Sequence, residues 1–75
     1  MSVGIELLNE IERVAGKRER WKQYSIETPE IALGLKPGIA LMGLAIERAK
    51  DAIANNDAVA SIAALEDLRG YDSDD

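Results

Sequence analysis

The 75-residue sequence contains neither cysteine nor histidine. Without cysteine no disulfide can form, and without either residue the usual zinc, copper and iron sites are excluded. Nucleophile–base pairs built on cysteine or histidine are excluded as well. A domain this short buries only roughly 60% of the surface that its unfolded chain exposes, and small domains compensate with disulfides, metals or self-association. Of these three, the sequence favours self-association.

The sequence also lacks the patterns of export and of membrane insertion. The sequence does not begin with basic residues followed by an apolar stretch, so we expect no signal peptide. Its longest unbroken apolar run, residues 38–46, is far shorter than the roughly 20 residues that a membrane-spanning helix needs. We therefore expect a cytoplasmic protein that does not bind or enter a membrane.

The net charge is acidic, −5 with a pI near 4.6. A general affinity for nucleic acid is therefore unexpected. A helix-turn-helix is also unexpected, because the candidate recognition helix carries Glu66 and Asp67 and its only cation is Arg69. The acidic surface does permit another function, in which the protein imitates nucleic acid and blocks a nuclease or a DNA-binding protein.

Hydrophobic periodicity predicts an all-α fold. Apolar residues recur at alternating spacings of three and four, as in amphipathic helices. Ser2 and Thr28 are expected to cap helices, and Pro37 is expected to separate a short helix from a long one. In the polar turn at residues 55–57, asparagine tolerates the left-handed conformation that ends a helix and Asp57 is expected to cap the next one, so the last two helices should form an antiparallel hairpin. The prediction is a small bundle of three helices (about 3–23, 37–55 and 57–69) with a short extra helix (about 29–34).

Residues 1–70 are predicted to form a single helical domain, followed by a flexible acidic tail at 71–75. The tail holds three aspartates, but no turn glycine or distal glutamate follows them, so we expect no metal site there. Carboxylate pairs one helical turn apart (Glu6 with Glu10, and Glu47 with Asp51) are expected on solvated faces, where nothing raises a pKa. We therefore predict that the protein is not an enzyme and needs no cofactor.

Residues 38–46 contain no polar side chain. A helix that is apolar on every side must be buried on every side, and one small chain has few elements with which to cover it. Gly43 would also allow another backbone to approach closely. We therefore predict a homo-oligomer. Its predicted interface consists of Ile39, Leu41, Met42, Gly43 and Leu44.

Residues 13–24, here called the basic segment, carry five cations against one acid. Arg13, Lys17 and Arg20 share one helix face, and Trp21 and Tyr24 lie beside it. Guanidinium groups next to an indole can hold a phosphate while a base stacks, so these five residues are predicted to bind an anionic nucleotide or a single strand. In the alternative interpretation, Trp21 belongs to the core and the charges are solvated or paired with acids.

This compact, acidic, cysteine-free helical character resembles that of small accessory proteins encoded by bacteriophages. These include helical oligomers that sequester nucleotide signals and acidic inhibitors of host defence proteins. The resemblance concerns character alone and carries over no site residue. It implies a non-enzymatic, homo-oligomeric interaction protein, an anti-defence inhibitor that binds a host macromolecule. The alternatives are a sponge for a nucleotide second messenger, using the basic segment, and the acidic nucleic-acid mimic.

Overall fold

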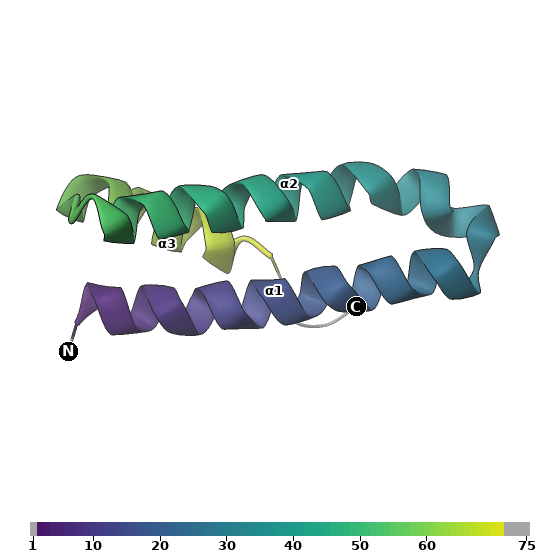
Figure 1. Ribbon diagram of the computed structural model, residues 1–75, viewed down its shortest axis with the longest axis horizontal. Coiled ribbons are helices and arrows are strands. Elements are labelled where there is room, and N and C mark those ends of the chain that lie inside the picture. The colour runs from purple at the N-terminus through teal and green to yellow at the C-terminus, as the bar shows by residue number, and fades with distance from the viewer. Residues whose placement is uncertain (1, 72–75) are drawn as a thin grey trace.

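The computed structural model describes residues 2–71 and contains three helices, with no strand, in that range. They are α1 (Val3–Glu27), α2 (Pro29–Ala54) and α3 (Ala58–Arg69). α1 and α2 run antiparallel along the 41 Å long axis, and α3 folds back against both of them (Figure 1). The all-α prediction and the antiparallel hairpin of the last two helices are confirmed. The aspartates of the predicted tail lie outside the described residues.

α3 is too short to cover the other two helices along their whole length. It has 12 residues, whereas α1 has 25 and α2 has 26, so it spans only about 18 Å. The hydrophobic core is confined to the end of the molecule that α3 reaches: its buried residues end at Val14 in α1 and begin at Met42 in α2. Beyond them only α1 and α2 remain (Figure 1). Residues 17–41 are called the two-helix half below.

The predicted break at Pro37 and the separate short helix at 29–34 are wrong. α2 begins at Pro29 and continues without interruption through Pro37. An internal proline removes one helical hydrogen bond and crowds the preceding turn, at a cost of about 3 kcal/mol. The carbonyl that loses its donor belongs to Leu33, a residue that is 82% exposed, where water can replace the missing N–H. Packing of the opposite face of α2 against α1 offsets the rest of this cost.

The two helix-to-helix connections differ in how they are capped. In the second, Asn56 takes a left-handed conformation with φ of 53°, and the Asp57 carboxylate accepts a 3.0 Å hydrogen bond from the Ala60 amide, both as the sequence predicts. In the first, Thr28 is a single linking residue that makes no side-chain cap bond, and Ser2 makes none either. Ser2 and Thr28 therefore stand at the predicted N-cap positions, but the predicted side-chain bonds are absent. α1 extends four residues further than predicted.

Of the described helices, α2 alone is long and apolar enough, by length and composition, to cross a bilayer, with a mean hydropathy of 1.3 in its most apolar stretch. The core helix of a helical bundle meets the same criteria. Only 17% of that stretch is buried within the chain. The important consequence is that most of this apolar helix faces outward.

Candidate functional site

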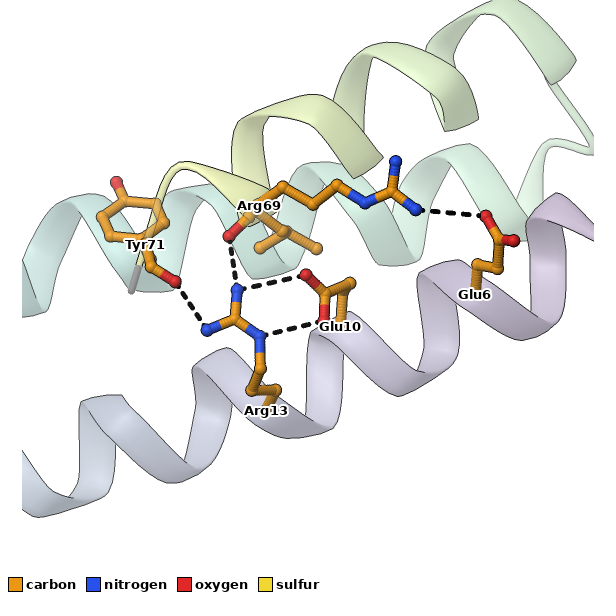
Figure 2. Close-up of polar contacts among 6 residues, drawn as sticks. Glu6, Glu10, Arg13, Arg69 and Tyr71 are labelled. Carbon is orange, nitrogen blue, oxygen red and sulfur yellow. Dashed lines mark hydrogen bonds and ion pairs between the residues drawn. The ribbon is translucent and has the colours of Figure 1, made fainter. Parts of the chain in front are cut away.

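The most extensive polar contact in the described chain joins α1 to the end of α3. The Arg13 guanidinium binds the Glu10 carboxylate through two nitrogens, at 2.9 and 3.1 Å. It also donates to the carbonyl oxygens of Leu68, at 3.0 Å, and of Tyr71. Figure 2 shows the guanidinium between the carboxylate and the last turn of α3. Because the last carbonyls of a helix lack intrahelical donors, Arg13 acts as a side-chain cap for α3.

This pairing shifts the titration of Glu10. Hydrogen bonding from Arg13 holds the pKa of the Glu10 carboxyl below its ordinary value; partial burial opposes this, and the charges of Arg13 and Arg69 add to the lowering. The Arg69 guanidinium itself lies 3.3 Å from the Glu6 carboxylate on α1 (Figure 2). The Glu6 carboxylate therefore connects α1 to α3 directly, whereas Glu10 does so through Arg13, and each acid has a cation against it.

Lys17 and Trp21 of the basic segment come together beside the core. Lys17 is only 6% exposed, and its Nζ lies 5.4 Å from the centroid of the Trp21 ring, within cation–π range. The ring in turn lies on Gly38 of α2, where a Cβ would collide with it. Trp21 is half-buried and packs against the core cluster. The Trp21 side chain therefore helps to join α1 to α2, and Lys17 lies against its ring.

Arg20 and Tyr24 lie nearer the surface. The Arg20 guanidinium folds back along α1, with Nη1 3.7 Å from where a Cβ would stand at Gly16. Tyr24 is 38% exposed. The structure thus brings together Lys17 and Trp21 of the five predicted ligand residues, while Arg13 lies at the end of α3. Binding of a phosphate by these five residues stays a prediction.

The five predicted interface residues differ in how far they are buried. Met42 is completely buried in the chain's own core, so it is not at the surface available to a partner. Gly43 is half-buried against the Arg18 guanidinium, and the Ile39 carbonyl accepts a 2.9 Å hydrogen bond from Arg18 Nε. Leu41 and Leu44, by contrast, are 55% and 53% exposed. Of the predicted interface, only these two leucines are prominent on the surface.

A second exposed apolar surface lies at the tip of the two-helix half, near the connection between α1 and α2. It is an open groove of about 660 Å³ with a mainly apolar lining and a lysine from each helix. Ile26 and Leu33 on it are 73% and 82% exposed. The lining residues are Lys22, Ser25, Ile26, Pro29, Ala32, Leu33, Lys36 and Ile39.

Residues 2–71 contain no group of three acidic, histidine or cysteine side chains that could hold a metal ion. They also contain no buried side-chain nitrogen or oxygen atom without a hydrogen-bond partner. Comparison of the chain with protein families, with curated proteins and with solved structures finds no match in any of the three. The exposure of the apolar groove and of Leu41 and Leu44 makes the candidate site the apolar surface of the two-helix half together with the adjoining Leu44.

Some contacts between the helices were not predicted, although the sequence holds a signal for them. Glu10 and Arg13 are three residues apart, the spacing of a helical ion pair. Arg18 interrupts the apolar stripe of α1 where a contact with another helix is expected, and a glycine, Gly43, stands opposite it. No sequence signal pairs Trp21 with Gly38, because that contact depends on the register of α1 against α2.

Proposed function

We propose that this chain is a non-enzymatic, homo-oligomeric interaction protein that acts by binding another macromolecule through its two-helix half. The observation that supports this proposal is the exposure of Leu41, at the end of this half, and of the adjoining Leu44, 55% and 53%, on a helix whose opposite side is packed on α1. Fully burying a leucine contributes about 1.5–3 kcal/mol. Leaving both exposed therefore forgoes stabilisation that a second polypeptide would supply.

The total surface supports the same conclusion. The chain exposes 5051 Å², whereas a compact monomer of this mass exposes about 4,500 Å². Part of this surface belongs to the two-helix half, which the core under α3 does not reach, and an interface there would remove it from water.

The groove at the hairpin tip supports the binding of a different macromolecule. Exposed apolar side chains form its walls, and Lys22 and Lys36 stand on opposite helices beside it. This chemistry suits an apolar segment of a partner protein with acidic residues near it. Inhibition of a host defence protein, as in bacteriophage accessory proteins, stays a prediction.

The nucleotide sponge and the nucleic-acid mimic also stay predictions. The contacts within residues 2–71 favour structural roles for the basic segment, because Arg13 caps α3 and Lys17 lies against Trp21. We therefore propose the apolar surface, rather than the basic segment, as the binding site.

Sedimentation equilibrium of the purified chain at micromolar concentration tests the proposal. We expect a mass above the 8.2 kDa of one chain. Replacing both Leu41 and Leu44 by glutamate should give a monomer with unchanged helix content. Val59→Glu is the matched control, because Val59 is 80% exposed on α3, away from the two-helix half, and it should leave the mass unchanged. A wild-type chain that sediments as a monomer throughout contradicts the proposal.

A further inference from the structure

The outward face of α2 carries the spacing of a coiled-coil contact line. Six exposed positions follow one another at intervals of four, three, four, three and four residues, and this alternation keeps side chains on one face of a helix toward a partner helix. This set is called the outer seam. Its members are Glu30, Gly34, Pro37, Leu41, Leu44 and Arg48.

The chain itself does not cover the outer seam. The residues of α2 that enter the core are a different set, including Met42, Ile46 and Ala49, and they lie on the side of α2 that faces α1. All six seam positions are exposed. Between its two charged ends the seam is therefore a non-polar, exposed face separate from the core face of α2, with the spacing of a helix-packing surface.

We propose that the outer seam is covered by α2 of a second copy, packed antiparallel about a two-fold axis at position 39. This inference rests on the self-association proposed above and adds its occupant and its register. The axis brings Pro37 of each copy opposite Leu41 of the other. At the next pair of seam positions, Gly34 of each copy lies opposite Leu44 of the other. At the last pair, Glu30 lies opposite Arg48.

Gly34 supports this register. A Cβ built there would meet nothing within 4 Å, so no contact inside the described chain requires a glycine. Glycine inside a helix costs about 1 kcal/mol relative to alanine. In the antiparallel pair Gly34 forms the hole that receives Leu44 of the second copy, as a knob enters a hole. The absence of a side chain at this position then has a physical reason.

The charges at the two ends of the seam favour the antiparallel direction. No ion pair among residues 2–71 includes Glu30 or Arg48, although Arg48 borders a groove that acidic residues of α2 and α3 also line. The two-fold axis places Glu30 of each copy beside Arg48 of the other. A parallel pair would bring glutamate to glutamate and arginine to arginine. Exposed ion pairs contribute only about 0–1 kcal/mol each, so these contacts select direction and register more than they supply affinity.

Charge reversal tests the register. Glu30→Arg and Arg48→Glu should each weaken dimerisation about fivefold to tenfold, because each creates two like-charge contacts. The double variant E30R/R48E should return the dissociation constant to near the wild-type value. Glu47→Arg is the matched control, since Glu47 is exposed beside the seam, and it should change the dissociation constant little. Equal effects of the single and double variants overturn the register.

Disulfide trapping gives an independent readout, because the natural chain has no cysteine. A mixture of Gly34→Cys and Leu44→Cys chains should form the mixed disulfide on mild oxidation, whereas Leu41→Cys alone should not cross-link. In the antiparallel pair, positions 34 and 44 lie directly opposite each other, whereas the two copies of position 41 are offset by about 6 Å along the axis. Added to the separation of the two backbones, this offset exceeds the Cα distance of about 7 Å that a disulfide can bridge.

The outcomes separate this inference from the proposed function. Cross-linking of Leu41→Cys with itself, or a dimer that is insensitive to charge reversal, overturns the antiparallel seam and leaves self-association intact. A chain that remains monomeric at every concentration overturns both. Mixed-disulfide formation together with charge-swap rescue supports both.

Discussion

The Arg18 guanidinium lies directly against the bare backbone of Gly43. Its Nε and Nη2 are each 3.0 Å from the place where a Cβ would stand, and Nε donates a 2.9 Å hydrogen bond to the carbonyl oxygen of Ile39. Arg18 occupies a position of α1 where the periodicity predicts an apolar side chain. The glycine on α2 therefore creates room for a cation between the two long helices.

Gly43→Leu should destabilise the folded monomer. A leucine there must displace the Arg18 guanidinium, and overpacking of this kind costs about 1–3 kcal/mol. We expect a loss of that size in the free energy of unfolding, measured by urea denaturation at a protein concentration where the chain is monomeric.

A double-mutant cycle attributes this loss to the Arg18 contact. In an Arg18→Ala background the leucine has space, so the cost of Gly43→Leu should fall by about half or more, as expected for residues in direct contact. An equal cost in both backgrounds would show that Arg18 and Gly43 are not coupled.

Gly38→Ala and Gly34→Ala, one helical turn apart on α2, should change stability in opposite directions. The first places a Cβ against the Trp21 ring and should cost about 1–3 kcal/mol. The second adds a Cβ in open space and should stabilise the helix by about 0.5–1 kcal/mol. Urea unfolding of monomeric protein, followed by the fluorescence of the single tryptophan, measures both. Similar changes in the two variants would refute the packing of Trp21 on Gly38.

Arg13→Ala should loosen the last turn of α3. It removes donors from the carbonyls of Leu68 and Tyr71, and hydrogen bonds from a charged group contribute about 1.5–3 kcal/mol when well buried. Because the Arg13 side chain is 27% exposed, we expect about 1–2 kcal/mol. Hydrogen–deuterium exchange should become faster at residues 65–71.

Lys22→Ala is the control for this experiment. Lys22 pairs with Glu19 at 3.2 Å within a single helix and at the surface, so its loss should cost roughly 0.5 kcal/mol or less. It should leave exchange in α3 unchanged. Equal protection of α3 in the Arg13→Ala variant and in the wild type would rule out the capping role.

The features predicted correctly from the sequence depend on local patterns. The periodic apolar positions identify the helices, and the residues of the 55–57 turn supply both a left-handed conformation and a side-chain cap. The break at Pro37 was wrong because a local penalty of about 3 kcal/mol is outweighed by packing along the rest of α2. The low helix propensity of Pro37 alone could not predict that the packing energy of α2 exceeds this penalty.

The candidate site was only partly predictable, because the register of α2 against α1 decides which of its residues are buried and which are exposed. Periodicity identifies residues 38–46 as apolar all round, and Leu41 and Leu44 are indeed exposed while Met42 is buried. Which of these faces the core depends on where α1 lies. The position of Arg13 at the end of α3 likewise depends on how far α3 folds back, which no local pattern encodes.

The stability of the fold should depend on the ionisation of Glu10. Its pKa is lowered in the folded state, chiefly by the hydrogen bonds from Arg13, so the carboxylate form stabilises the fold. This contribution is fully present above the unfolded-state pKa of about 4.3 and is lost as the pH falls through the lower folded-state pKa. Unfolding free energies of wild type and Glu10→Gln should therefore differ by a constant amount above about pH 5 and converge in acid.

A carboxyl-resolved NMR titration checks the cause. The pKa of Glu10 should lie below the ordinary glutamate value in the wild type and should rise in Arg13→Ala, because that substitution removes the hydrogen bonds that lower it most. A Glu10 pKa that is unchanged by Arg13→Ala would show that another group stabilises the carboxylate. The pH-dependent difference between wild type and Glu10→Gln would then have to persist in the Arg13→Ala background.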